Sequence, residues 1–297
     1  MAMQHRVSGS GPARHVLSAG QEDSRHPLGV HPLNEEVSVV VGGPIHRAGA
    51  YILDRFLANQ KEIQRRCPSA ELVLATVEHD FADELDAMLG SLGVRGRVLR
   101  YTTVKPPHAR SRTWNIACGR EAIREYMVSQ TDAKYLLCVD GDMTYDPAIV
   151  EVMEREIEGH EAVFSGYVTK MYHKWGGLAL VGGACCMLTR GVAEKLRFRC
   201  IEFKNGHCLF EDTLLEFDLM RARARIRKGF FLSTSHYRSE TVSRHLSPRR
   251  VGTLRRMANT TVVRYALIWS SLVLRRHVAW DLKRVVRALL NAVGDKP

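Results

Sequence analysis

The chain lacks the signals that mark three common classes of protein. Its seven cysteines include no Cys-x-x-Cys pair and no histidine at the spacing of a zinc site. No apolar run is long enough to span a bilayer, and the N-terminus lacks the charged, apolar and small-residue succession of a secretory signal. These absences predict reduced thiols in a cytoplasmic protein. The composition, 45% hydrophobic and 25% charged, is typical of a globular protein and shows no internal repeat.

Acidic residues are scarce in only one part of the chain. From Arg221 to the C-terminus, 18 Lys and Arg face 3 Asp and Glu, a net charge of +15, whereas the other 220 residues carry −4. The whole basic excess therefore lies in the last quarter. A nucleic-acid-binding protein without catalysis would explain this basic excess and stays an alternative, although it would leave the acidic body of the chain unexplained.

Strand and helix patterns alternate after a leader of 34 residues. Residues 1–34 show no apolar periodicity and predict a flexible segment outside the fold. Strands are expected at 37–41, 71–77, 97–103 and 134–139, and helices at 50–67, 81–93, 109–130 and 148–159. The first strand is expected to break at Gly42-Gly43-Pro44. This βαβ rhythm predicts an α/β fold with a mostly parallel sheet over residues 35–240, followed by a basic amphipathic helical extension over 241–297.

The strand at 134–139 runs directly into two like charges, Asp140 and Asp142. Such a pair repels unless a cation lies between the carboxylates, and Mg²⁺ or Mn²⁺ is typically held by one or two carboxylates together with substrate phosphates. Asp146 and Pro147 are suited to begin the next helix, so "DGDMTY" is expected to be a strand-to-helix loop at the ligand-binding edge of the sheet. The alternative is a solvated turn.

Three later segments carry further candidate residues. Glu211 and Asp212 end an apolar stretch before a helix, where they would act in a site or only stabilise the helix N-terminus. His236 ends a predicted strand and would be either a neutral metal ligand or an ordinary histidine. Gly182 and Gly183 provide a small-residue surface, which would either give room for a sugar or allow tight backbone packing.

In order, these segments resemble GT-A-type glycosyltransferases of the family-2 kind, which use nucleotide-diphospho-sugars. The matching segments, which cover about Val37 to Tyr237, are "VSVVVGGPIHR", "ELVLATVEH", "ARSRTWNIACGREAI", "YLLCVDGDM", "GGACCMLTRGVAEKL", "FEDTLLEFDLMRARARIRKG" and "STSHY". The resemblance implies a GT-A, Rossmann-like catalytic domain. The first loop lacks an acid that the family often has, and the Q-x-x-R-W motif of processive synthases is absent, which favours a non-processive enzyme.

The resemblance also implies roles for individual residues. Asp140, Asp142 and His236 match metal-binding positions, with Asp142 favoured as the direct ligand, and Asp212 matches the catalytic base of inverting members. The residues matched to donor binding are Glu78, Arg110, Arg112, Asn115, Asp140 and Gly141. Those matched to the acceptor side are Gly182, Gly183 and Glu211. The implied reaction is metal-dependent transfer of a hexose from a UDP- or GDP-linked sugar to an acceptor hydroxyl, with Mn²⁺ or Mg²⁺ as cofactor.

Two alternatives concern the enzyme class and the extension. A nucleotidyltransferase uses similar carboxylates, but no glycine-rich phosphate loop follows the first strand. In the extension, arginines interleave with Trp269, Trp280 and aliphatic residues, a pattern that suits an anionic membrane surface through residues 255–293 and hence a lipid-linked acceptor. The same apolar stripe is expected if the helices pack on the catalytic domain or on a second subunit of a homo-oligomer. If the acceptor is not lipid-linked, we expect it to be a sugar or a small metabolite.

Overall fold

The computed structural model describes residues 36–166, 182–206, 208–241 and 243–277. All of them belong to one compact unit, Glu35–Pro297. The predicted leader and the last part of the predicted extension lie outside the described residues. No helix in the described ranges is both long enough and apolar enough to cross a membrane.

The described residues form a mixed sheet of seven strands in the order β10-β6-β7-β4-β1-β2-β3. Neighbouring strands are parallel except at β7, which is antiparallel to both β4 and β6. These strands are β1 (Val39–Pro44), β2 (Ala70–Thr76), β3 (Gly96–Arg100), β4 (Tyr135–Val139), β6 (Ala162–Ser165), β7 (Cys185–Thr189) and β10 (Ile226–Gly229). The chain runs outward from β1 in one direction through β2 and β3 and then returns to β4, so the order reverses between β1 and β4. In such sheets ligands bind at the carboxyl ends of the strands where the order reverses.

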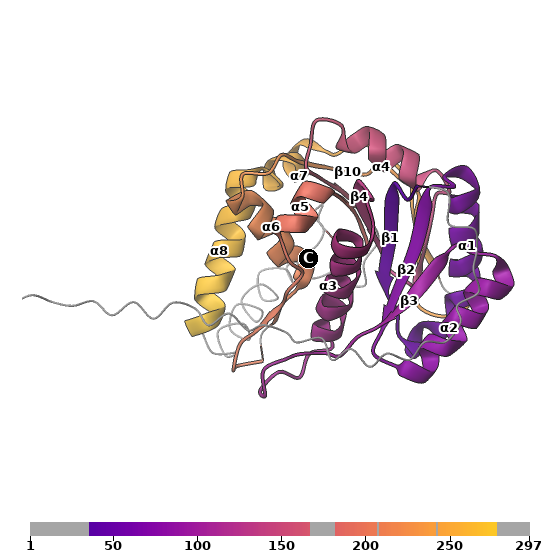
Figure 1. Cartoon of the computed structure of the whole chain (residues 1–297). Helices are drawn as coiled ribbons and strands as arrows, with labels where there is room; N and C mark the ends of the chain where they lie inside the picture. Colours follow the sequence, from indigo (N-terminus) through magenta and orange to yellow (C-terminus); the bar gives the residue numbers. More distant parts are fainter. Residues whose placement is uncertain (1–35, 167–181, 207, 242, 278–297) are drawn as a thin grey trace, which may run out of the picture. The chain divides into compact units, whose positions relative to one another are not determined.

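Helices cover both faces of this sheet and produce two apolar cores. Figure 1 shows α1 and α2 on one side of β1, β2 and β3, with α3 on the other. The first core also takes side chains from α4, and the second takes side chains from α5 and α6. These helices are α1 (Leu53–Arg66, preceded by the 3-10 turn Arg47–Ile52), α2 (His79–Leu92), α3 (Thr113–Gln130), α4 (Ile149–Ile157), α5 (Arg190–Lys195) and α6 (Glu211–Arg221). The predicted mostly parallel α/β sheet with flanking helices is confirmed.

The first strand does not break at its glycines, contrary to the sequence prediction. β1 continues through Gly42 and Gly43 to Pro44, in register with β2. A Cβ on Gly42 would lie 2.3 Å from Ile123 Cγ2, and one on Gly43 would lie 2.7 Å from the carbonyl oxygen of Val139. The glycines are therefore required because α3 and β4 approach the strand closely, and not because the chain turns.

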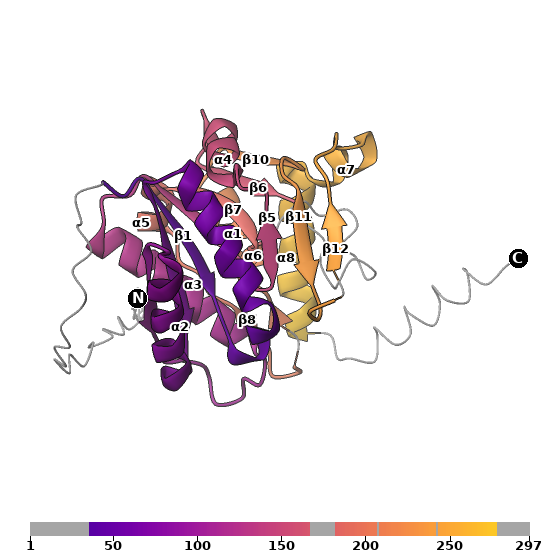
Figure 2. The ribbon, with the colours of Figure 1, turned by 90° about the vertical axis from the view of Figure 1, so that its right-hand side faces the viewer.

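The predicted loop after β4 also contains a strand. β5 (Met143–Tyr145) joins β11 (Thr234–Tyr237) and β12 (Ser243–Leu246) in a small antiparallel sheet, and Figure 2 shows the three strands side by side. Helix α4 begins at Ile149, one residue after the predicted start, and its N-cap is Ala148 and not Asp146. The Asp146 carboxylate instead accepts a hydrogen bond from the backbone N–H of Ala148 at 2.9 Å. A short hairpin, β8 (Ile201–Glu202) with β9 (Cys208–Leu209), precedes α6.

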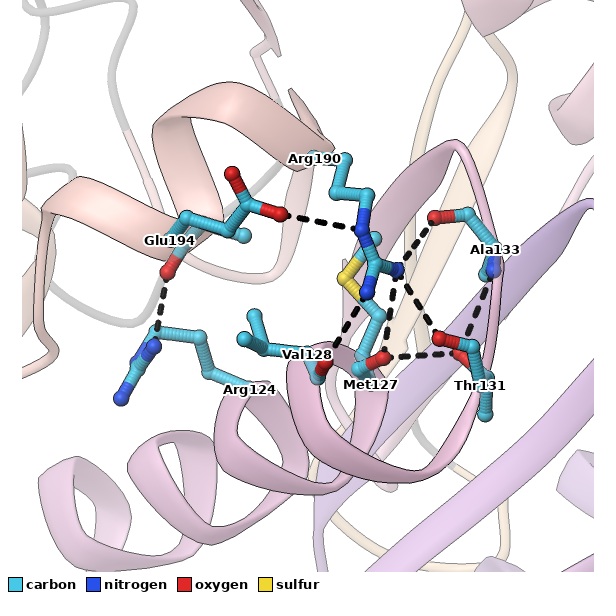
Figure 3. Close-up of polar contacts among 8 residues, drawn as sticks. Arg124, Met127, Val128, Thr131, Ala133, Arg190 and Glu194 are labelled. Atoms are coloured by element: carbon cyan, nitrogen blue, oxygen red, sulfur yellow. Dashed lines mark hydrogen bonds and ion pairs between the residues drawn. The ribbon is translucent and has the colours of Figure 1, made fainter.

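One arginine joins the end of α3 to the start of α5. The Arg190 guanidinium donates hydrogen bonds to carbonyl groups in the last turn of α3 and in the segment that follows it, and its Nε donates to the Glu194 carboxylate at 3.0 Å (Figure 3). The carbonyls belong to Met127, Val128, Thr131 and Ala133, at 2.9 to 3.5 Å. Satisfying these groups fixes α3 against β7 and α5, and α3 carries residues of the candidate site.

Two helices at the C-terminal end, α7 (Thr253–Ala258) and α8 (Thr261–His277), follow the small sheet. α8 packs on α6, where Ile268 contacts Phe217 and Met220 and where the Tyr265 and Phe217 rings stack at 5.0 Å. A buried ion pair fixes the same contact, because the fully buried Glu216 accepts hydrogen bonds at 3.0 and 3.1 Å from Arg264 Nε and one from Lys228 of β10 at 2.5 Å. The first part of the predicted extension therefore packs on the α/β unit, through α6 and β10.

Candidate active site

The site begins at the carboxyl end of β4, beside the point where the strand order reverses. Asp140 and Asp142 follow β4, and each is about one-third exposed at its side chain. The Tyr145 hydroxyl accepts a hydrogen bond from the Asp140 backbone N–H at 2.8 Å and donates one to the carbonyl of Ala184 at 2.6 Å. Asn59 of α1 also pairs with both backbone groups of Tyr145, at 2.8 Å each. The loop that carries the aspartates is thus fixed from α1, from β5 and from the residue that precedes β7.

His236 reaches Asp142 through the pairing of β5 with β11. His236 lies opposite Met143 in that pairing, and the Tyr237 backbone N–H donates to the Asp142 carbonyl at 3.0 Å. This register places His236 Nε2 3.1 Å from Asp142 Oδ2. The other ring nitrogen, Nδ1, is buried and has no hydrogen-bond partner among the described residues.

Arg120, which the sequence analysis did not single out, lies at the centre of the site. It points from α3 into the sheet with its side chain 2% exposed, and its guanidinium contacts Asp140 Oδ1 at 2.6 Å and Glu211 Oε1 at 3.5 Å. It also donates to the Gly183 carbonyl. One buried arginine thus connects the loop after β4, the segment before β7 and the start of α6. The available signal was a charged residue on the apolar face of α3, one turn before Ile123 and two turns before Met127.

The carboxylates around Arg120 have raised pKa values. Burial raises the pKa of Asp140, Arg120 opposes that rise, and Asp142 adds to it. Burial, together with the neighbouring Asp212, raises the pKa of Glu211 to about 8 despite the pull of Arg120. Burial also raises the pKa of Asp212, against the hydrogen bonds from Thr213. The negative charge here exceeds what Arg120 neutralises, which favours binding of a further cation.

Asp212 is not the N-cap of α6, although both acids lie in its first turn, where a negative charge stabilises the helix N-terminus. The N-cap is Phe210, which makes no side-chain cap bond, and Asp212 lies in the first turn. Its Oδ1 accepts from the backbone N–H of Thr213 at 2.6 Å, while Oδ2 has no hydrogen bond among the described residues. Glu211 is buried and contacts Arg120. Asp212 is thus the more accessible of the two carboxylates.

The predicted donor-binding residues lie on segments around the same edge of the sheet. Glu78 follows β2, and its Oε2 accepts from the backbone N–H of Arg47 at 2.7 Å. Asn115 is in the first turn of α3, with Oδ1 accepting from Thr103 Oγ1 at 2.9 Å. Arg110 and Arg112 precede α3 with exposed side chains. The donor-binding role of these four residues stays a prediction.

Glu202, another residue that the sequence analysis missed, fixes the loop that carries Arg110 and Arg112. From β8 its carboxylate accepts hydrogen bonds from the backbone N–H groups of Arg110 and Ser111, at 2.9 and 3.0 Å, and from Trp114 Nε1 at 3.1 Å. The loop is therefore held in place by hydrogen bonds to its backbone and to the Trp114 ring, which leaves both arginine side chains free to meet a ligand.

The predicted site glycines lie in close contact with neighbouring side chains. A Cβ on Gly141 would lie 3.3 Å from Ile45, and one on Gly183 would lie 2.8 Å from Arg120 Cζ. Gly182 is buried beside Gly183. The space next to Gly183 thus holds the Arg120 guanidinium, which accounts for this glycine by packing. The acceptor-binding role of Gly182, Gly183 and Glu211 stays a prediction.

The donor atoms of Asp142 and His236 fit one divalent cation. Ligands at about 2.1 Å on adjacent vertices of an octahedron are about 3.0 Å apart, and Asp142 Oδ2 lies 3.1 Å from His236 Nε2. Asp140 differs, because Arg120 already engages its Oδ1. The described residues contain no group of three or more side chains arranged to hold a metal. A cation here would therefore take its remaining ligands from substrate oxygens and water.

No protein-family model and no curated protein matches this sequence. Among solved structures, the mannosyltransferase PcManGT from Pyrobaculum calidifontis, in complex with GDP-Man and Mn²⁺, superposes with a TM-score of 0.51 at 12% identity, over 89% of this chain and 77% of that protein. S. aureus TarS 1-349 superposes with a TM-score of 0.44 at 11% identity, over 83% and 77% of the two chains. The likeness to PcManGT shows a GT-A-type fold and confirms the resemblance seen in the sequence at the level of the fold.

Proposed function

We propose that the protein is a metal-dependent glycosyltransferase that moves a hexose from a UDP- or GDP-linked donor to an acceptor hydroxyl, with inversion and without processive elongation. The observation that carries the proposal is the 3.1 Å approach of Asp142 and His236 at the carboxyl end of β4, close to the carboxylates that begin α6. The fold shared with PcManGT, a mannosyltransferase whose structure contains GDP-Man and Mn²⁺, supports this donor class and cation.

Asp142 and His236 would hold Mn²⁺ or Mg²⁺, with the donor diphosphate completing the coordination. The bound cation would supply positive charge to the departing diphosphate. Asp140, held by Arg120, would act from beside the cation on the donor ribose or on a coordinated water. Because Arg120 anchors Asp140 and Glu211 together, the donor and acceptor sides of the site would keep a fixed separation.

Asp212 would act as the general base on the acceptor hydroxyl. Its Oδ2 accepts the hydroxyl proton while the hydroxyl oxygen forms a bond to the anomeric carbon of the donor sugar. The bond between that carbon and the diphosphate oxygen breaks, and its electron pair leaves with the nucleoside diphosphate. The raised pKa of Asp212 supports this role, because burial makes the carboxylate a stronger base. Glu211, with its pKa of about 8, would be protonated at neutral pH and donate a hydrogen bond to the acceptor.

Thermal unfolding in the presence of nucleotides tests the donor site. UDP and GDP are compared with and without Mn²⁺ on the wild type, on Asp142→Ala and on Asp132→Ala, an exposed control. We expect one nucleotide, only with Mn²⁺, to stabilise the wild type and the control. At a hundredfold excess over Kd the gain is about 2.7 kcal/mol, or roughly 5–10 °C. Equal stabilisation of Asp142→Ala, or no shift in well-folded wild type, would refute the proposed donor site.

Asp212→Asn tests the base separately from donor binding. We expect sugar transfer to fall about 10²- to 10⁴-fold, while the metal-dependent stabilisation by the nucleotide persists because the donor contacts remain. Asp132→Asn, the same change at an exposed carboxylate outside the site, serves as the matched control and should transfer at the wild-type rate. Turnover of Asp212→Asn at the wild-type rate would remove Asp212 from the mechanism and leave the donor site unaffected.

A further inference from the structure

The face of α8 that points away from α6 is apolar and exposed. At the helical period, Arg264, Tyr265, Ile268 and Leu272 lie on the side that packs against the catalytic domain. The remaining arc of the helix carries Val262, Val263, Ala266, Leu267, Trp269, Ser270 and Val273, with Trp269 and Leu267 at its two margins. Of these, Val262 is 80%, Leu267 52% and Trp269 53% exposed. Arg264 is the sole charged residue between Thr261 and Val273, and it is engaged by Glu216. We call this exposed set the outer face of α8.

Such a face is unusual for a helix that packs on a soluble domain, because the solvent side of these helices is normally polar. A contiguous exposed apolar patch instead marks an interaction surface. The position of α8 agrees with an interaction surface, because the helix lies at the edge of the catalytic unit, beside α6 and away from α1 and α2 (Figure 1). Packing on α6 therefore accounts for only one side of the apolar pattern.

The charges that flank the outer face are all positive. Residues 241–280 contain eight arginines and no Asp or Glu. Arg250 and Arg256, both exposed, line a cavity of about 700 Å³ between β10 and the start of α8, together with Arg227, Lys228 and Arg249. Arg227 and Lys228 are paired with Glu156 and Glu216, so Arg250 and Arg256 add positive charge that these carboxylates do not offset. The surface thus combines an apolar face with a cationic cavity near one end.

We propose that the outer face of α8 docks on an anionic lipid bilayer, with Val262, Leu267 and Trp269 inserted at the interface and with the cavity at Arg250 and Arg256 receiving a phosphate headgroup. Apolar side chains that enter the acyl boundary beside arginines that meet headgroups are what an interfacial helix requires. A second copy of the chain is disfavoured as occupant, because two copies would bring like charges together. Nucleic acid is disfavoured as well, because its charged backbone would not bury the apolar side chains of the outer face. The proposal does not depend on the transferase activity.

Vesicle flotation of the full chain tests the proposal. Vesicles of phosphatidylcholine alone are compared with equimolar phosphatidylcholine and phosphatidylglycerol, over a series of salt concentrations. We expect the wild type to float with the anionic vesicles, less so as salt rises. The double variant Leu267→Ser, Trp269→Ser should lose binding at least tenfold, and Arg250→Glu, Arg256→Glu about thirtyfold or more. Val104→Ser, which changes an apolar side chain 63% exposed outside the extension, is the matched control and should bind like the wild type.

Measurements of folding and oligomeric state complete the test. Because the substituted side chains are exposed, the thermal midpoints of the variants should match that of the wild type, and Val262→Ser is the substitute if the double variant does not fold. No binding of the wild type to anionic vesicles, or equal binding by folded outer-face variants, overturns the proposal. A wild-type dimer that the outer-face variants dissociate, without vesicle binding, would assign the face to a second copy. Duplex DNA binding without vesicle binding would overturn the proposal as well.

Discussion

Replacing Arg120 by Met tests whether one buried cation holds the carboxylate cluster together. The substitution keeps a similar volume on α3 but removes the guanidinium that contacts Asp140, Glu211 and the Gly183 carbonyl. We expect a folded but less stable protein, in which the carboxylates repel one another and a buried carbonyl loses its donor.

The stability that Arg120→Met loses depends on how exposed Asp140 is and on whether Glu211 is protonated. Removing one partner of a buried ion pair costs about 3–5 kcal/mol. The low end applies here, because the Asp140 side chain is 32% exposed and because Glu211, with a pKa of about 8, is mostly protonated at pH 7. A loss of about 3 kcal/mol lowers the thermal midpoint by roughly 6–12 °C. Glu211→Gln alone should cost less than about 1 kcal/mol for the same reason.

A double-mutant cycle in urea, without divalent cations, measures the Arg120–Asp140 interaction directly. Arg120→Met, Asp140→Asn and the double variant are compared at pH 7, and we expect a coupling energy of about 1–2 kcal/mol. Arg124→Met is the matched control, because Arg124 is equally buried one turn further along α3 but pairs with Glu121. Its cycle with Asp140→Asn should be additive. Additivity within about 0.5 kcal/mol for Arg120 and Asp140 would refute the reasoning.

Two further predictions concern the attachment of α8 and the packing of β1. Arg264 holds the pKa of the buried Glu216 below its usual 4.5 against desolvation, so the pair stabilises the protein above pH 4.5 and is lost as pH falls. Urea unfolding should show Glu216→Gln about 3 kcal/mol less stable at pH 7, with a gap that closes towards pH 3; a constant gap would contradict this. Gly42→Ala should cost about 1–3 kcal/mol and be partly relieved by Ile123→Ala, whereas Gly43→Ala, which meets backbone, should gain nothing from the same change.

The local elements could be predicted because their signals are local. Apolar runs marked the strands, and the observed bounds of β2, α2 and α3 differ from those predicted by at most four residues. The prediction failed where a neighbour decided the outcome. Gly42 and Gly43 stay in β1 because Ile123 and Val139 approach them, and β5 forms because β11, about ninety residues later, supplies its partner. The residues next to Gly42, Gly43 and β5 in the sequence indicate neither of these long-range contacts.

The sequence by itself determined the alternation of strands and helices, the two aspartates at a strand end and the concentration of positive charge in the last quarter. The tertiary structure alone decided that His236 lies against Asp142, that Arg120 joins Asp140 to Glu211, and that one side of α8 packs while the other stays exposed. The physical reason is that local spacing fixes which face of an element a side chain occupies. Sheet order, register and helix packing fix which distant face it meets.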